Sequence, residues 1–243
     1  KERSKFEAGA KEHHGIEPRV SGPVFDLMEK FAGYGFNKSH AAAYSLLAYH
    51  TAWLKAHHPE AFMAAVLSCD MEHTDKVVSF IDECAGLGIE VLPPDINRSD
   101  YAFTVAGPGT IRYGLGAIKG VGEGAVEAFV RERERGGEFR DLVDLCRRVD
   151  LKQAGKRTLE AMVKAGCFDG FGRTRASLAA AVPAAIQLGE QRTRATAAGQ
   201  DDLFGPLAEP VHESAPPEIV FPSLPEWTEA ERLAGEPLRL GPL

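Results

Sequence analysis

Several features that mark other classes of protein are scarce in this sequence of 243 residues. No apolar run approaches the ~20 residues that cross a bilayer, so we expect no membrane-spanning helix and no membrane partner. The four cysteines stand far apart, at positions 69, 84, 146 and 167, and none forms a CxxC pair. This spacing argues against a disulfide framework or a zinc site, so we expect buried thiols in a reducing cytoplasm. The adjacent pairs His13-His14 and His57-His58 would point different ways on a helix, so we predict no metal site.

An excess of positive charge is also missing, because the formal net charge is −7 at pH 7. This value excludes a protein whose whole surface is basic enough to attract nucleic acid. The charges are, however, unevenly distributed along the chain. Residues 147–175 include eight basic and three acidic residues, whereas residues 176–243 include four basic and ten acidic ones. We interpret the basic block either as a nucleic-acid contact or as the solvated surface of ordinary helices.

The most informative stretch is Ile111–Arg135, with the sequence IRYGLGAIKGVGEGAVEAFVRERER. It predicts a short apolar turn, a tight bend at Gly120-Val121-Gly122 and a helix from Glu123 onward. Glycines on either side of an apolar residue let the backbone turn sharply without a Cβ clash. They also leave the amides of the bend and of the first helical turn unpaired, and such amides bind anions, phosphate in particular. The pattern predicts a helix-hairpin-helix motif that binds a DNA backbone without reading its sequence, and the alternative is an ordinary helical hairpin.

The same pattern recurs loosely at residues 164–170, followed by a helix from about Arg173. Two such units in tandem would form a compact four-helix module. The basic block directly follows the first hairpin, which favours DNA binding over a solvated surface. The predicted DNA-binding residues are Lys119, Gly120, Val121, Gly122, Gly124, Lys152, Lys156 and Arg157.

A second polar cluster, Asn37-Lys38-Ser39-His40, precedes an expected helix from about residue 40 to residue 57. A cation, a hydroxyl and an imidazole crowd this helix start, where the helix dipole already favours negative charge. A triphosphate could bind there. The alternative is a capped helix with a solvated lysine.

A third motif, Gln200-Asp201-Asp202-Leu203-Phe204, stands just before residues 205–225, which contain six prolines and which we expect to be an exposed linker. Adjacent Leu and Phe side chains on a flexible segment are costly to leave in water. Together with Gln200 they form a short binding peptide. The Gln200 amide can form hydrogen bonds, and the two apolar side chains can fill a pocket on a partner. Pentapeptides of this form dock onto ring-shaped DNA sliding clamps. The alternative is a loop that folds back on its own domain.

Apolar spacing and breaker residues predict a mainly α fold with a small β element. We expect residues 1–30 to form helices broken at Gly15 and at Ser21-Gly22-Pro23, with Ser21 capping the second piece. Strands are expected around residues 89–92, 101–105 and 110–113.

Six blocks of the sequence occur in a distinctive order. They are FDLMEKFAGYGFNKSHAAAYSLLAYHTAWLKAHHPEAFMAAVLSCDM, ECAGLGIEVLPPDIN, YGLGAIKGVGEGAVEAF, FRDLVDLC, LEAMVKAGCFDGFG and GQDDLFG. In this order they resemble the alpha subunits of bacterial replicative DNA polymerase III, which belong to the C-family of polymerases. The resemblance covers nearly the whole chain.

The resemblance implies four segments. Residues 1–72 correspond to the C-terminal part of the polymerase fingers, and residues 73–115 to a helix with a small β connector. Residues 116–188 correspond to a tandem helix-hairpin-helix DNA-binding module, and residues 189–243 to a flexible clamp-binding segment with a Pro-rich linker. Lys38 and His40 would face the incoming deoxynucleoside triphosphate. The implied partners are duplex primer-template DNA, the sliding clamp (beta subunit) and other polymerase III holoenzyme subunits, in the bacterial cytoplasm.

Two differences from the family's sequence pattern limit the functions that we assign to this chain by resemblance. The family's catalytic carboxylates lie upstream in a palm domain, and no matching acidic motif occurs in this chain. Because two-metal nucleotidyl transfer needs those ligands, we expect no polymerase activity and no cofactor in this chain alone, and Mg in the parent enzyme. Residues 237–243 depart from the family, and we assign them no function.

The chain starts without Met and as if in mid-helix, so we expect a piece of a longer protein. Two other interpretations stay open. One is a non-enzymatic adaptor that carries a DNA-binding module and a clamp peptide. The other is a purely structural helical domain.

Overall fold

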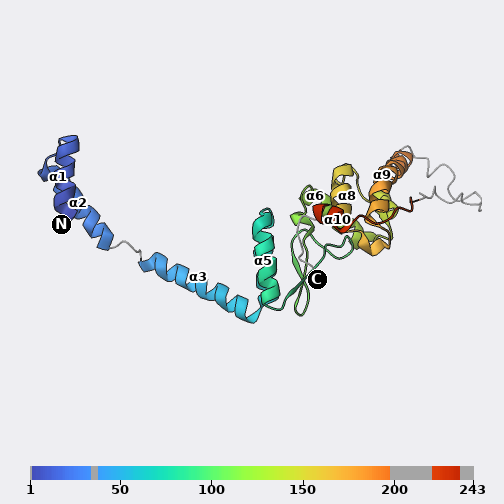
Figure 1. Ribbon diagram of the computed structural model, residues 1–243, viewed down its shortest axis with the longest axis horizontal. Helices are drawn as coiled ribbons and strands as arrows, with labels where there is room; N and C mark the ends of the chain where they lie inside the picture. The colour runs from blue at the N-terminus through green and yellow to red at the C-terminus, as the bar shows by residue number, and fades with distance from the viewer. Residues whose placement is uncertain (1, 34–37, 198–220, 236–243) are drawn as a thin grey trace, which may run out of the picture. The chain divides into compact units, whose positions relative to one another are not determined.

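A computed structural model describes residues 2–33, 38–197 and 221–235 (Figure 1). The described chain is mainly helical with one small sheet, as the sequence predicts. It forms two compact units, residues 1–57 and residues 58–243, and each is considered by itself. The segment boundaries expected from the sequence stay predictions.

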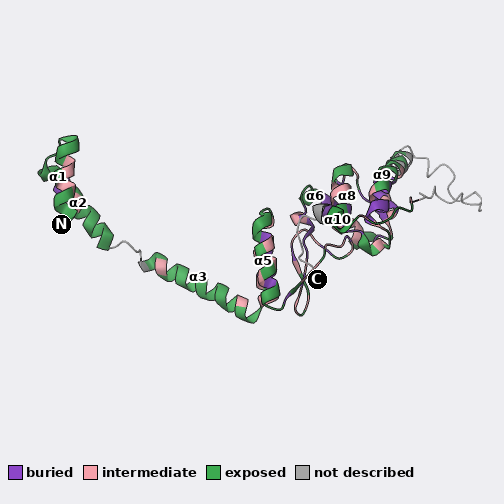
Figure 2. Cartoon of the chain, viewed as in Figure 1, coloured by how far each residue is buried: buried purple, intermediate pink, exposed green. Residues whose placement is uncertain are grey.

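The first unit contains α1 (Glu2–His14), α2 (Pro18–Gly33) and α3 (Lys38–His57). α1 packs against α2, where the rings of Phe6 and Phe25 lie 5.5 Å apart. α3 is solvent-exposed along almost its whole length (Figure 2), and its exposed side chains include large apolar ones such as Leu47 and Trp53. A concentration of exposed apolar side chains of this kind is typical of a surface that packs against another segment.

One predicted break in the first unit is wrong. α2 begins at Pro18 and runs through Ser21-Gly22-Pro23 without interruption, so Ser21 does not cap a separate helix. Ser21 and Gly22 are buried beneath α1, and a Cβ on Gly22 would lie 3.1 Å from a carboxylate oxygen of Glu7. These small residues therefore allow close helix packing instead of marking a turn.

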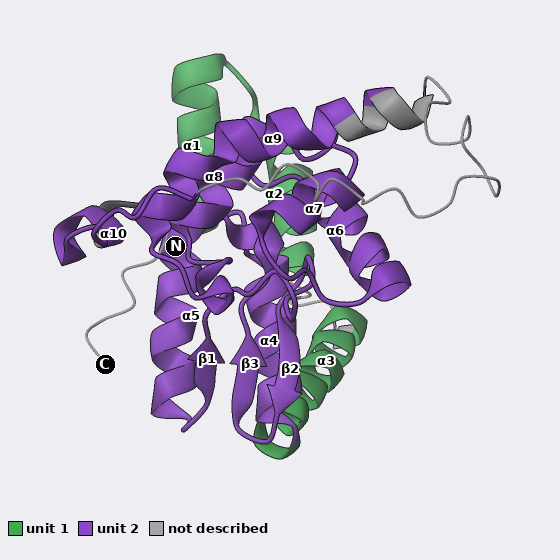
Figure 3. Ribbon diagram, turned by 90° about the vertical axis from the view of Figure 1, so that its right-hand side faces the viewer, with its two compact units in different colours: residues 1–57 green, residues 58–243 purple. Residues whose placement is uncertain are grey.

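The second unit begins with α4 (Pro59–Cys69) and α5 (Thr74–Gly86), which pack beside a three-stranded sheet (Figure 3). Its strands are β1 (Glu90–Leu92), β2 (Thr104–Gly107) and β3 (Thr110–Arg112), in the order β1-β3-β2. β1 runs parallel to β3, and β2 runs antiparallel to it. The turn between β2 and β3 is tied to α4, because the Gly109 amide donates to a carboxylate oxygen of Glu60 at 2.9 Å.

The rest of the second unit is helical. Its elements are η1 (Leu115–Ala117), α6 (Glu123–Gly136), α7 (Leu142–Arg148), α8 (Lys156–Lys164), η2 (Asp169–Phe171), α9 (Arg175–Ala197) and α10 (Glu229–Gly235). Their inner faces supply most of a continuous core, whose largest fully buried side chains include Leu115, Phe129, Leu142, Leu159, Met162 and Phe168. This core fixes α6, α7, α8 and α9 against one another.

The packing of two of these helices depends on a glycine. α9 packs along α7, and Gly189 of α9 faces the main-chain carbonyl of Cys146. A Cβ atom at Gly189 would lie well inside the van der Waals distance of that carbonyl oxygen. Because the obstacle is backbone, any side chain here would force the two helices apart.

We predict that Gly189→Ala lowers the free energy of unfolding by about 1–3 kcal/mol, the usual cost of overpacking a tight core. Urea denaturation followed by circular dichroism would measure it. The matched control is Gly86→Ala in the last turn of α5, where a Cβ would meet nothing within 4 Å. We expect the control to unfold within about 0.5 kcal/mol of the parent sequence. Equal stability of the two variants would contradict the close approach.

Candidate nucleic-acid interface

The first hairpin is an exposed backbone bend held between two buried side chains. Ile118 and Val121 are only 3% and 7% exposed, whereas Gly120 and Gly122 are exposed. Gly120 has a φ of +91°, a conformation that residues with a side chain rarely adopt. The Val121 amide donates to the Ile118 carbonyl at 3.0 Å and closes the bend. Core packing therefore fixes the bend, while its glycine backbone faces solvent.

The start of α6 presents bare amides at this bend. Gly122 is the N-cap residue, and no side chain caps the helix. In the described chain, the amides of Gly122, Glu123 and Gly124 donate to no backbone carbonyl. A Cβ at Gly122 or Gly124 would meet nothing within 4 Å, so the approach to these amides is open. They are accessible to an anion that arrives from solvent.

α8 begins beside the same bend. The Thr158 hydroxyl, in the first turn of α8, donates to the Gly120 carbonyl at 3.4 Å. Gly155 is the N-cap of α8, and this helix start also has no side-chain cap. Lys156 and Arg157 follow it and are exposed. Two uncapped helix starts and two cations therefore lie next to one another.

The remaining predicted DNA-binding residues differ in accessibility. Lys119, at the bend, and Lys152, in the connection between α7 and α8, are both exposed. Val121 is buried, so it can offer a ligand only its main chain. Lys156 lies 3.6 Å from Glu160 in an exposed pair, which costs little to open. The bend and the start of α8 thus supply the accessible groups.

Not every cation of the basic block is available to a ligand. Arg148 is largely buried and pairs with Asp144 at 3.2 Å. Arg175 is 8% exposed and pairs with Asp169 at 2.7 Å. Both arginines connect elements of the fold. The count of basic residues in the sequence therefore overstates the charge that a nucleic acid would meet.

The predicted nucleotide-binding cluster is only partly described. Ser39 and His40 lie exposed in the first turn of α3, and the His40 ring lies 4.4 Å from the ring of Tyr44. Lys38 is the first residue of α3, but its side chain and all of Asn37 lie outside the described residues. The predicted clamp motif, residues 200–204, also lies outside them. The roles assigned to both motifs stay predictions.

Other chemistry finds little support in the described residues. They contain no group of three or more His, Cys, Asp or Glu side chains that could hold a metal ion, and none of their helices could span a membrane. Cys84, Cys146 and Cys167 are buried and form no disulfide, whereas Cys69 is exposed, contrary to the expected burial. Burial raises the pKa of the Cys146 thiol to about 12, so it supplies no thiolate near neutral pH.

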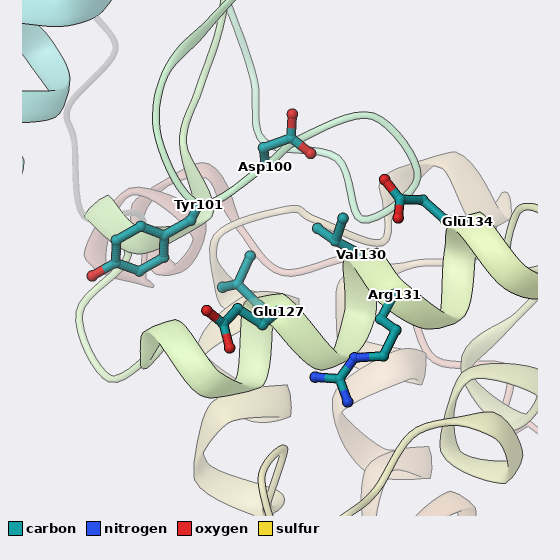
Figure 4. Close-up of a pocket in the computed structure, with 7 residues that line it drawn as sticks. Asp100, Tyr101, Glu127, Val130, Arg131 and Glu134 are labelled. Atoms are coloured by element: carbon teal, nitrogen blue, oxygen red, sulfur yellow. The ribbon is translucent and has the colours of Figure 1, made fainter.

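A pocket of about 390 Å³ lies along the side of α6 (Figure 4). Its lining includes the carboxylates of Asp100, Glu127 and Glu134 but only one cation, Arg131. An excess of negative charge disfavours phosphate. This pocket is therefore not part of the nucleic-acid interface.

Sequence reasoning missed the contribution of Thr158. A hydroxyl three residues after Gly155 at a helix start was a visible signal for a local hydrogen bond. Its actual partner, Gly120, is 38 residues away in the sequence, and no local pattern identifies it.

Comparison with known proteins adds independent information about this surface. A family described as a helix-hairpin-helix motif matches residues 88–178, which run from the sheet into the start of α9. The chain is 49% identical to the DNA polymerase III subunit alpha of Vibrio cholerae serotype O1, of Escherichia coli strain K12 and of Pseudomonas aeruginosa, in each case over 99% of its length. It spans only 20% to 22% of the length of these relatives. This chain therefore belongs to the DNA polymerase III alpha subunit family and corresponds to about a fifth of the length of those members.

Proposed function

We propose that this chain is the segment of a bacterial replicative DNA polymerase that holds duplex primer-template DNA by its sugar-phosphate backbone. The observation that carries the proposal is the proximity of two uncapped helix starts, those of α6 and α8, at one exposed glycine bend. Main-chain amides and helix dipoles attract phosphate whatever the base sequence. Lys119, Lys156 and Arg157 add charge that neutralises neighbouring phosphates. A replicative polymerase needs a contact of this kind, because the DNA that it synthesises can have any base sequence.

We predict that the double variant Lys156→Gln/Arg157→Gln of the 243-residue chain binds duplex DNA more weakly. Each lost phosphate contact reduces the slope of log affinity against log salt by about 0.9, so the slope should fall by about 2. Fluorescence anisotropy over a salt series measures this, and duplexes of two unrelated sequences should behave alike.

The control for this experiment is Lys5→Gln/Lys11→Gln, which removes the same charge from exposed positions on α1. We expect its salt slope to equal that of the parent sequence. Equal losses in the two double variants would show that net charge alone matters, and the proposed interface would then be abandoned.

The proposed activity of the whole parent protein is DNA-directed DNA synthesis. Nucleotidyl transfer of this kind uses two metal ions held by carboxylates. The resemblance to the family implies that these carboxylates lie in an upstream palm domain, so we propose that the Mg site belongs to another part of the parent. The role of this chain is then to bind and position substrates. Other polymerase III holoenzyme subunits are proposed partners, and the bacterial cytoplasm is the proposed location.

The start of α3 is proposed to contact the incoming deoxynucleoside triphosphate. Ser39 and His40 are exposed in a first helical turn, where the dipole favours a phosphate. We predict that Lys38→Gln in the full-length parent raises KM for the nucleotide roughly tenfold, the effect of losing about 1.4 kcal/mol of binding. Steady-state primer extension measures it, with Lys30→Gln on α2 as the control. An unchanged KM would remove Lys38 from the site.

Residues 200–204 are proposed to tether the parent protein to its sliding clamp. Two adjacent apolar side chains after a glutamine suit a peptide that fills a pocket on a partner. We predict that Leu203→Ala/Phe204→Ala abolishes clamp binding in surface plasmon resonance and leaves duplex affinity unchanged. Leu207→Ala, in the Pro-rich region that directly follows the motif, is the control and should bind normally. Clamp affinity that persists in the double variant would place the tether elsewhere.

A further inference from the structure

The second hairpin of the module differs from the first in what lies at its helix start. It joins α8 to α9 through Gly166, whose φ is +83°, and through η2, with Phe168 buried beneath it. α9 begins at Arg175. The first two residues of α9, Arg175 and Ala176, are buried, whereas the first two of α6, Glu123 and Gly124, are exposed. Another part of the chain therefore covers the second helix start.

The group that covers it is a carboxylate. The Arg175 amide donates to Oε2 of Glu226 at 3.0 Å, and the Trp227 amide donates to Oε1 of the same side chain at 2.8 Å. Desolvation raises the pKa of Glu226, but hydrogen bonds from the amides of Arg175, Trp227 and Ala176 lower it by more, so the carboxyl is held ionised. The Thr174 hydroxyl accepts from the Ser177 amide at 3.2 Å, so Glu226 takes the part of this helix start that Thr174 leaves open. An anion thus accepts from a helix-start amide, the arrangement that a phosphate would adopt.

Residues 221–228, which we call the docking segment, hold this carboxylate in place. The Leu224 amide donates to the Ser177 hydroxyl at 3.1 Å, and the Leu224 carbonyl accepts from the Thr174 hydroxyl at 3.0 Å. The Arg173 guanidinium lies 4.2 Å above the ring of Phe221. Trp227 packs against the core. The docking segment overlaps the region, residues 205–225, in which the sequence predicts an exposed linker. Residues 223–225 are exposed as expected, whereas Phe221 and Pro222 are partly buried.

The two hairpins can now be compared directly. At the first, the helix-start amides are open and cations stand beside them. At the second, Glu226 occupies the equivalent position, and Arg173 is engaged by Phe221. We propose that the second hairpin is a phosphate-type anion site filled by Glu226, so that the docking segment confines DNA-backbone binding to the first hairpin. The inference rests on the proposed function, because it concerns which half of the module meets the duplex.

The test compares Glu226→Ala with Glu229→Ala in the 243-residue chain. Glu229 is an exposed glutamate at the start of α10, so its variant loses the same charge from the same region. Removal of Glu226 opens a second phosphate site, so duplex affinity should rise several-fold and the salt slope should steepen by about 0.9, the value of one phosphate contact. The control should show neither the rise in duplex affinity nor the steeper salt slope. If Glu226→Ala folds and matches the control, the inference is overturned.

A second measurement decides the question even if Glu226→Ala fails to fold. Amide NMR shifts of the parent sequence, titrated with an unlabelled duplex, should change at Gly122 and Gly124 and stay constant at Arg175 and Ala176. Changes at Arg175 and Ala176 at the same DNA concentration would overturn the inference. If the parent sequence binds no duplex at low salt, the proposed function fails instead. If it binds through Gly122 and Gly124 alone, both proposals are supported.

Discussion

Unpaired main-chain amides at a helix start are the constraint around which this module is organised. Every α-helix begins with amides that have no carbonyl partner within the helix. α6 leaves them open because its N-cap is Gly122, which has no side chain to fold back, and because the bend before it points outward. The side chain of Val121 is buried in the core and fixes the position of that bend. The amides cannot reorient when a ligand arrives, so little ordering entropy is lost on binding, as suits a contact that is preorganised for phosphate.

The basic residues around the module divide into two groups by exposure. Arg148 and Arg175 are used inside the fold, where a planar guanidinium can pair with a carboxylate and donate to carbonyls at the same time. Arg157 stays exposed, and so do Lys152, Lys156 and Lys164. A lysine suits this position because its ammonium group is strongly hydrated and interacts with phosphate as a mobile point charge. The functional charge of the basic block is therefore smaller than its composition indicates.

Local sequence patterns predicted the first hairpin well, because most of what shapes it lies between Leu115 and Glu123. The glycines, the buried Val121 and the α6 start all follow from the order of residues along that stretch. The break predicted at Ser21-Gly22-Pro23 failed because small residues serve turns and close packing equally well, and only the contact with Glu7 on α1 decides between them.

Long-range contacts could not be predicted from the sequence, because no local pattern identifies a partner that lies far along the chain. The bonds from Thr158 to Gly120 and from Arg175 to Glu226 join residues 38 and 51 positions apart. Nothing in the local pattern around Glu226 distinguishes it from the other glutamates of an acidic tail. The roles of residues 37–40 and 200–204 rest on sequence resemblance and stay predictions.

The Glu226 contact has two consequences that reinforce each other. By accepting from the Arg175 amide it stabilises the start of α9, which the Thr174 hydroxyl also caps by accepting from the Ser177 amide. As an occupant of an anion site it competes with any phosphate that approaches from solution. A group attached to the same chain competes at an effective concentration of about millimolar or higher, and Phe221 and Trp227 retain the docking segment independently of the carboxylate. A single backbone phosphate has weak affinity for one helix start, so it does not displace such a group. Two hairpins of similar design thus take different roles: one stays open to the duplex, and the other binds the protein's own tail.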